Sequence, residues 1–272
     1  MIVPLLFAAS ILIGDAADLS LTARAEAQRR IEQARYAFVI GNTQPFEELY
    51  PRSVFEARVA REAAEEEVLK RVFGMVVTPA LLAEEFERIE KTTRAPDQWA
   101  AIKKALGHDR RLIEEAFCRP PLVQRALRSR FAFDRNIHAQ PHQKARHARA
   151  SLLTGRAIPD ATAQILQRKA GAAANTDQML SKARSEATGP RVLRPAAERD
   201  PNAPIPIDPE IATVLKKELK RPGDVTTILE ERDQFRVFRL VEAKPDTWKV
   251  MAVRFPKVDF EVWFAEALGG SR

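Results

Sequence analysis

The first half of the chain places apolar residues at the spacing of amphipathic helices. The clearest stripe lies in residues 53–73, where apolar side chains recur every three to five positions. It consists of Phe55, Val59, Ala63, Val68 and Val72. Similar stripes predict further helices over residues 79–89, 97–106, 109–117 and 121–131, and residues 24–40 are predicted as a charged helix. We interpret all of these stripes as core rather than as part of a cofactor site.

Capping residues and helix breakers stand at the ends of these stripes. Gly41 and Gly74 follow the last apolar positions, as C-terminal stop signals do. Ser53 and Thr78 precede apolar runs and are predicted as N-caps, and a proline follows Thr78 at the first helical position. Pro120-Pro121 are expected to break one helix and begin the next, because proline has no backbone N–H.

From residue 149 onward the pattern changes to short segments. Residues 150–154 are consistent with a short strand, and residues 160–168 and 176–187 are interpreted as helices. Six prolines in residues 190–209 predict a long extended loop. A helix over 209–219, capped by Asp208, precedes three predicted strands at 225–229, 235–241 and 248–255, with short turns that favour antiparallel pairing. A helix over 258–268 closes the chain, and the whole predicts an α+β fold.

Composition narrows the class of protein. The chain has 272 residues, of which 45 % are hydrophobic and 30 % charged, which excludes a collagen-like, disulfide-scaffold or wholly disordered chain. Its length suggests about two domains. Its single cysteine, Cys118, excludes an internal disulfide and a four-thiolate metal site.

The net charge is +7, but basic and acidic residues mostly alternate, as on solvated helix faces. The most biased stretch is 125–149, where seven Lys and Arg residues stand against Asp134 alone. It is interpreted as a solvated helix face, with an acidic or phosphate-bearing partner as the alternative. Nucleic acid is not the expected partner.

The N-terminal residues 2–13 are nearly all apolar, which is too short for the ~20 residues of a membrane-spanning helix. Their length suits the apolar region of a secretory signal, with small residues placed for cleavage before Ala17. No Lys or Arg precedes the run, although secretory signals normally begin with a basic segment. The alternatives are an apolar first helix that packs on the folded protein and a retained membrane anchor. We expect a periplasmic or otherwise exported protein.

Two ordered motifs connect the helical half to a known family. They are Gly74-Met-Val-Val-Thr78-Pro-Ala-Leu-Leu82 before an acidic helix and Leu106-Gly-His-Asp109 before the next helix. Together with the order of helices, they resemble the N-terminal chaperone region of SurA-type and PrsA-type exported foldases over roughly residues 55–138. The resemblance implies that a parvulin-type prolyl isomerase domain follows, and that a C-terminal helix returns to the helical domain.

The second half is similar to that scheme in two places. Residues 219–225 resemble the family's "L-x-x-G-x-V" step, and residues 233–240 resemble its "G-Y-H-I-I-K-L" strand. The implied domains are a signal-like segment at 1–17, a helical chaperone domain at 18–147, a divergent parvulin-like domain at 148–257 and the returning helix at 258–272.

The catalytic pattern of the parvulins is not matched. Residues 148–153 carry no histidine where the family has "A-x-H-I-L", and His147 stands several residues too early. The family's second histidine falls on Arg236, and the proline-rich stretch 190–209 replaces its glycine-rich acidic turn. Cys118 belongs to the helical half. We therefore expect weak or no isomerase activity and assign no catalytic or cofactor-binding residue.

Other chemistry is weakly indicated. His138 and His142 have the i, i+4 spacing of helical zinc ligands, with His147 nearby, but the segment is better interpreted as a solvated linker, and no metal ligand is assigned. The carboxylate clusters 65–67 and 84–85 lie beside Lys and Arg and are interpreted as exposed faces. No glycine-rich phosphate loop or G-x-S-x-G elbow occurs in the sequence.

The functional hypothesis is an exported chaperone that binds unfolded or assembling proteins, possesses a parvulin-like domain of weak or no activity, and is membrane-associated if the N-terminal segment is retained. One alternative is an active peptidyl-prolyl cis–trans isomerase. The other is a structural or assembly subunit that uses the foldase fold to hold one fixed partner. No cofactor is implied.

Overall fold

The computed structural model describes residues 19–41, 43–168, 205 and 207–270. These residues combine helices with one four-stranded antiparallel sheet, so the prediction of an α+β fold is confirmed. The chain divides into two compact units. The helical unit comprises the chain up to Arg128 together with the end of the chain from Ala267, and the α/β unit comprises Ser129–Glu266.

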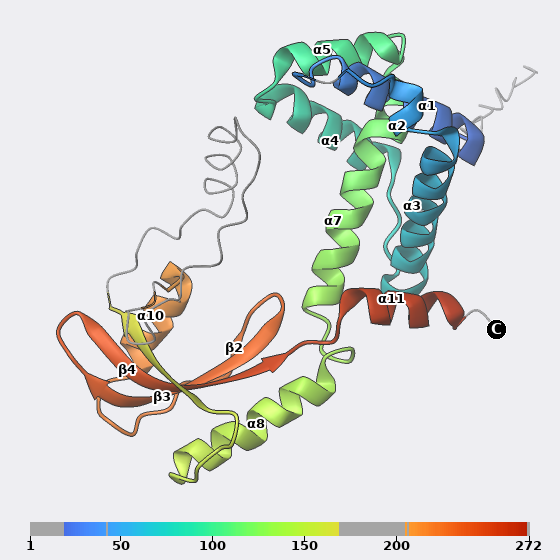
Figure 1. Ribbon diagram of the computed structural model, residues 1–272. Coiled ribbons are helices and arrows are strands. Elements are labelled where there is room, and N and C mark those ends of the chain that lie inside the picture. The colour runs from blue at the N-terminus through green and yellow to red at the C-terminus, as the bar shows by residue number, and fades with distance from the viewer. Residues whose placement is uncertain (1–18, 42, 169–204, 206, 271–272) are drawn as a thin grey trace, which may run out of the picture. The chain divides into compact units, whose positions relative to one another are not determined.

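The helical unit is built from a series of helices joined by short turns (Figure 1). They are α1 (Leu21–Tyr36), α2 (Phe46–Leu49), α3 (Arg52–Phe73), α4 (Pro79–Thr92), α5 (Pro96–Ala105), α6 (Arg110–Ile113), the π-helix η1 (Glu114–Cys118) and α7 (Arg119–Ala132), whose residues after Arg128 belong to the α/β unit. Helix α1 packs against α3, α5 and η1. Ile31 of α1 meets Trp99 and Ile102 of α5 in the main core, and burying such apolar side chains is the chief stabilising term.

Most helix ends follow the predicted capping residues. Gly74 ends α3 in the left-handed conformation, with φ 64°, and the Thr78 hydroxyl accepts from the Leu81 N–H at the start of α4. The Asp109 carboxylate likewise accepts from the Leu112 N–H. The predicted N-cap at Ser53 is wrong, because α3 begins one residue earlier and Pro51 occupies the cap position.

Two predicted boundaries in this half are also wrong. Helix α1 ends at Tyr36 rather than at residue 40, because residues 37–41 form turns. Pro120-Pro121 do not break a helix, because α6, η1 and α7 follow one another without interruption. The physical reason for this continuity lies in the π-helical segment η1.

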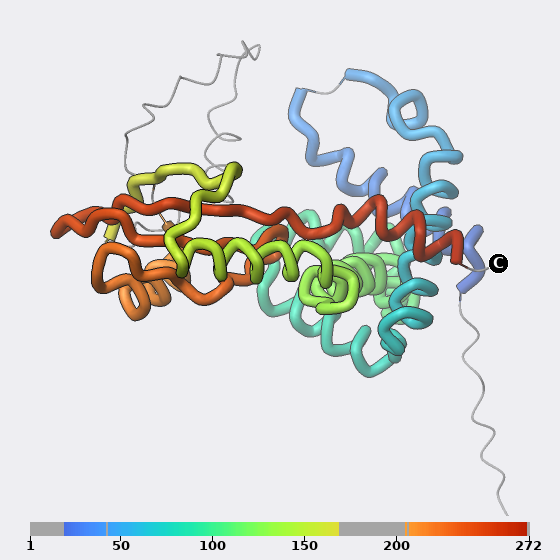
Figure 2. Tube along the Cα trace, turned by 90° about the horizontal axis from the view of Figure 1, so that it is seen from below, coloured from blue at the N-terminus to red at the C-terminus, as the bar shows by residue number. Residues whose placement is uncertain are grey.

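The α/β unit is a sheet with a helix on each face. Its elements are α8 (Ala139–Leu153), β1 (Thr162–Gln167), α10 (Pro209–Glu218), β2 (Leu229–Glu230), β3 (Gln234–Ala243) and β4 (Thr247–Pro256), followed by α11 (Phe260–Gly269), which continues past the end of the unit. The strand order is β1-β4-β3-β2, with all neighbouring strands antiparallel. Helix α8 runs along β3 and β4 (Figure 2).

Alternating residues of the strands bury against the two helices, as the period of two requires. On one face, Phe238 and Trp248 pack with Leu215 of α10 in the largest core of the unit. On the other face, Val237 and Val253 pack with Leu152 of α8. The sheet is therefore covered on both sides, and its two long central strands hold the core.

Several predictions for the second half are corrected. Residues 150–154 belong to helix α8 and its cap rather than to a strand, and residues 162–167 form β1 rather than a helix. Of the strand predicted at 225–229, only Leu229 lies in a strand, β2. The helix predicted at 176–187 and most of the loop at 190–209 lie outside the described residues.

Along the sequence, the division between the compact units falls between Arg128 and Ser129, and residues 147 and 148, at the predicted domain boundary, lie within α8. Helix α11 follows β4 directly. In the α/β unit, its Phe260 and Trp263 rings lie 5.2 and 4.8 Å from the ring of Phe131. Its last turn belongs to the helical unit, where the Arg71 guanidinium donates to the Ala267 carbonyl. No helix in the described part of the chain combines the length and apolarity needed to cross a membrane.

Candidate functional site

A cleft of about 550 Å³ opens in the helical unit between α1, α3, α4 and the η1–α7 segment. Its apolar wall consists of Ile31, Ile89, Phe117, Pro120 and Pro121. These residues come from three separate parts of the chain. Phe117, Pro120 and Ile89 are half-buried and Pro121 is exposed, so an apolar surface faces the opening of the cleft.

Arginines line the cleft too, and each has a carboxylate partner. The Arg58 guanidinium donates to Glu32 at 3.1 Å, and Arg35 donates to the same carboxylate at 2.7 Å. Arg88 donates to both oxygens of Glu85 at 2.8 and 2.7 Å. These paired charges leave the apolar wall as the part of the cleft that can accept a partner without breaking existing ion pairs.

Glu85 is buried, with 4 % of its surface exposed, and it also accepts from Arg125 at 2.9 Å. The hydrogen bonds from Arg88, and then those from Arg125, lower the pKa of this carboxyl despite its burial. Glu85 is therefore ionised at neutral pH and holds α4 to α7.

Glu62 differs from the other carboxylates of the cleft. It lies on α3, is half-buried, and has no hydrogen bond or ion pair to any residue that the structure describes. Burial raises its pKa to about 7; Arg58 opposes this effect and the neighbouring Glu65 adds to it. Near neutral pH, Glu62 is therefore the group whose charge state changes at the cleft.

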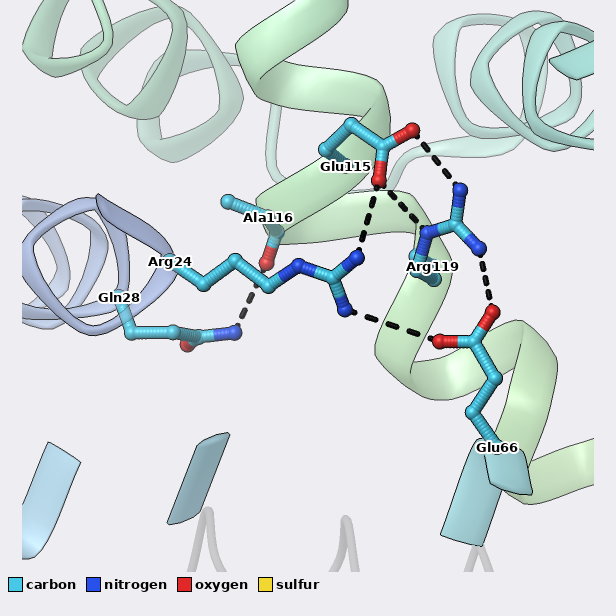
Figure 3. Close-up of polar contacts among 6 residues, drawn as sticks. All are labelled: Arg24, Gln28, Glu66, Glu115, Ala116 and Arg119. Atoms are coloured by element: carbon cyan, nitrogen blue, oxygen red, sulfur yellow. Dashed lines mark hydrogen bonds and ion pairs between the residues drawn. The ribbon is translucent and has the colours of Figure 1, made fainter. Parts of the chain in front are cut away.

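A partly buried ion network adjoins the cleft and connects α1, α3 and the η1–α7 segment (Figure 3). Arg119 is 6 % exposed and donates to Glu66 at 2.5 Å and to both oxygens of Glu115 at 2.7 and 2.8 Å. Arg24 of α1 lies 3.6 Å from Glu66 and 3.7 Å from Glu115. Two arginines thus alternate with two glutamates, so every charge in the ring faces an opposite one.

The π-helix explains why two consecutive prolines fit inside this helical segment. The Arg119 N–H donates to the Glu114 carbonyl, five residues back, which is the π-helical pattern. The Ala116 carbonyl would accept from residue 120 in an α-helix or from residue 121 in a π-helix, and both are prolines without an N–H. The Gln28 side chain of α1 donates to this carbonyl instead, at 2.8 Å (Figure 3).

A second hollow, of about 1,090 Å³, has all four network residues in its lining. Its apolar lining includes Val76, Val77 and Leu82. The network therefore lines this second hollow, and it connects helices that also form the cleft.

The carboxylate clusters were predicted as exposed faces, and this prediction is wrong for three of their five members. Glu65 and Glu85 are buried and Glu66 belongs to the network, whereas Glu67 and Glu84 are exposed. Helical phase was the available signal: Glu65 lies three residues before the buried Val68, and Glu85 lies three residues after the buried Leu82.

Cys118 lies in the core of the helical unit and has no exposed surface. Burial, together with the nearby Glu85 carboxylate, raises the pKa of its thiol to about 12. At neutral pH it is a protonated thiol without solvent access, which excludes a role as a nucleophile.

The three clustered histidines have separate positions. His138 is buried: its Nε2–H donates to the Phe131 carbonyl at 2.9 Å and its Nδ1 accepts from the Val258 N–H at 3.3 Å, so both ring nitrogens are used in the α/β unit. Burial lowers its pKa, which keeps the ring neutral. His142 packs edge-on against the Phe235 ring, and His147 is exposed. Among the described residues, no group of three His, Cys, Asp or Glu side chains is placed to hold a metal.

The first strand of the sheet lies later in the chain than predicted. It is β1, not residues 150–154, and it carries Gln164 immediately before Ile165-Leu166. Arg236 of β3 donates to the Glu231 carboxylate.

With this geometry established, comparisons with protein-family models, curated proteins and solved structures find no match to the chain.

Proposed function

We propose that the protein is an exported chaperone whose helical unit binds unfolded segments of other proteins, and whose α/β unit is a parvulin-like module with weak or no isomerase activity. The cleft of the helical unit carries this proposal. It combines an apolar wall that includes Phe117, Pro120 and Pro121 with arginines and glutamates that mostly neutralise one another. Such a surface suits apolar segments of varied sequence better than one charged small molecule.

The α/β unit supports the foldase part of the proposal through its topology and its substitutions. An antiparallel sheet with one helix on each face follows the helical unit, and the end of the chain from Ala267 belongs to the helical unit again. Neither histidine of the family pattern is matched, and Arg236 stands at the place of the second. Catalysis of bond rotation has to lower a barrier of ~18–20 kcal/mol by binding the twisted state, so the loss of this polar network favours binding without turnover.

Site-specific photocrosslinking tests the proposed client site. A photoreactive amino acid at Gln124 or Thr93, both at the cleft, is expected to crosslink to a chemically unfolded model protein. The matched control carries it at the exposed Lys104 on α5, outside the lining of the cleft. Equal crosslinking at Lys104 and at the two cleft positions would contradict the assignment of the cleft.

Two assays separate the proposal from its alternatives. The chaperone is expected to suppress aggregation of the unfolded model protein and to leave the isomerisation rate of a proline tetrapeptide near its uncatalysed value. Turnover at parvulin-like rates would establish the active isomerase instead. Lack of protection, together with co-purification of one fixed partner from the native host, would establish the assembly subunit.

A further inference from the structure

The cations of helix α8 differ from those of the helical unit in having no carboxylate partners. In the helical unit, glutamates stand one turn from arginines and pair with them, as in Arg29–Glu26 and Arg61–Glu65. Residues 135–159 contain no Asp or Glu. Within the part of the chain that the structure describes, Arg135, Lys144 and Arg146 are exposed and form no ion pair.

One side of α8 is fixed on the sheet, whereas Lys144 and Arg146 lie at exposed positions of the helix and Arg135 lies four residues before its start. Ala145, Ala148 and Leu152 are buried, with Ala148 and Leu152 packed against β3 and β4. Half-buried Arg149 donates to the Thr226 carbonyl at 2.8 Å, which anchors its guanidinium at the edge of the exposed side. The helix has 15 residues, so the exposed strip is about 22 Å long and is held in place by the sheet beneath it.

A hollow of about 880 Å³ lies along this strip and is lined by donor groups. Its polar lining comes from Arg135, His142, Gln143, Arg146, His147 and Ser151. No carboxylate contributes to it. Two guanidinium groups, with imidazole, amide and hydroxyl groups beside them, form a site for phosphate oxygens, for which arginine supplies paired donors.

We propose that the exposed side of α8 is a docking surface for an anionic phospholipid bilayer, with headgroup phosphates in the hollow beside the helix. This inference does not depend on client binding by the helical unit. The unpaired cations Arg135, Lys144 and Arg146 are complementary in charge to such a surface, and two of them line the hollow. Leu153, which is 56 % exposed, and Ile228 line an adjoining hollow together with Arg146, which places apolar groups beside cations as at a headgroup boundary.

A nucleic acid fits the same surface less well. Neither hollow beside α8 has a Phe, Tyr or Trp in its lining on which a base could stack. The strip also has apolar neighbours, which favour the boundary between headgroups and acyl chains over a phosphodiester backbone.

Vesicle co-sedimentation of the full chain tests the proposal. Vesicles of phosphatidylcholine with phosphatidylglycerol are expected to bind the protein, more weakly as salt rises, because exposed charges are screened over about 8 Å at physiological ionic strength. The variant Arg135→Gln/Lys144→Gln/Arg146→Gln is expected to bind about a hundredfold more weakly, at about fivefold per cation. The control Lys91→Gln/Arg94→Gln/Lys104→Gln removes the same charge from exposed positions of the helical unit and is expected to bind as the unaltered chain does.

A fluorescent label reports α8 itself, independently of the apolar N-terminal residues. An environment-sensitive dye on Gln143→Cys is expected to shift to the blue with the anionic vesicles and not with pure phosphatidylcholine; the native Cys118 is buried and does not react. Two results with the vesicles would each overturn the proposal: an unchanged dye spectrum with anionic vesicles, or equal binding by the two triple variants. Tighter binding to a DNA duplex than to the vesicles also overturns it and assigns the surface to nucleic acid.

Discussion

Replacing Glu62 by Gln is expected to stabilise the helical unit at alkaline pH and to have little effect at acid pH. Burial raises the pKa of Glu62 from 4.5 to about 7, so the folded chain retains a proton that the unfolded chain releases between these values. The free energy of unfolding contributed by Glu62 is therefore greatest below pH 4.5 and falls as the pH rises to 7. Gln has the shape of the protonated side chain and does not titrate.

The magnitude follows from the size of that pKa change. A change from 4.5 to about 7 corresponds to at most about 3 kcal/mol. Glu62 lines an open cleft and is only half-buried, so solvent screens its charge and we expect about 1–2 kcal/mol. The free energy of unfolding of the Glu62→Gln variant should thus be higher than that of the unaltered chain by this amount at pH 8 and equal to it at pH 4.

Urea unfolding followed by circular dichroism at pH 4, 6 and 8 measures this difference. Glu67→Gln is the matched control, since it removes the same charge from an exposed position on the same helix. Its effect on the free energy of unfolding should be small at all three pH values. The reasoning would be refuted if the Glu62→Gln variant were no more stable than the unaltered chain at pH 8, or if it were more stable by the same amount at pH 4 and pH 8.

Three further changes test other parts of the structure by the same unfolding measurement. Arg119→Met should cost about 3 kcal/mol, at the low end for a broken buried pair, because it leaves the half-buried Glu66 and Glu115 with Arg24 alone. Arg52→Met breaks an exposed pair with Glu56 and should cost less than about 1 kcal/mol. Similar costs for both would contradict the role of the network. Gly74→Ala should cost about 1 kcal/mol, because alanine is strained at φ 64° although nothing lies near its added carbon. Gly269→Ala, where the backbone φ is ordinary, should leave the stability nearly unchanged. A Gly74→Ala variant as stable as the unaltered chain would disprove the strain. Burial lowers the pKa of His138, so the stability that the neutral ring contributes is complete above pH 6.5 and is lost as the pH falls below it. The loss of unfolding free energy caused by His138→Gln should therefore be smaller at pH 5 than at pH 7. An equal loss at both pH values would show that His138 does not titrate in this way.

The helical half was largely predictable because its signals are local. Glycine and threonine act through their own backbone and neighbouring N–H groups, so Gly74 and Thr78 mark the ends of α3 and α4 without reference to the rest of the fold. The proline pair misled the prediction, because its effect depends on Gln28, which is distant in sequence and satisfies the Ala116 carbonyl. A side chain that replaces a missing N–H across 88 residues leaves no local pattern.

The start of the α/β unit was harder to predict for a similar reason. The run Ser151-Leu152-Leu153 is short enough to suit either a strand or a helix, and only the packing of Leu152 on the sheet decides for helix. Residues 162–167 contain polar side chains at an edge of the sheet, so their strand character comes from pairing with β4 rather than from an apolar run.

The candidate site was not predicted from the sequence. Phe117, Ile89 and Ile31 each belong to a stripe that also builds the core, and only the packing of α1, α4 and η1 leaves parts of them at a cleft. The ion network was missed because Glu66 and Arg119 are 53 residues apart and each has nearer charged neighbours that explain it equally well.

The π-helical turn at Glu114–Cys118 holds one residue more than a regular helix needs over the same rotation. Deleting one residue from this turn would let the segment return to α-helical geometry while the side chains of α7 keep their directions toward Glu66 and the cleft. A one-residue deletion within α7 itself would instead turn every later side chain by about 100° around the axis. The turn is therefore the place in this segment where a change in chain length disturbs the cleft least.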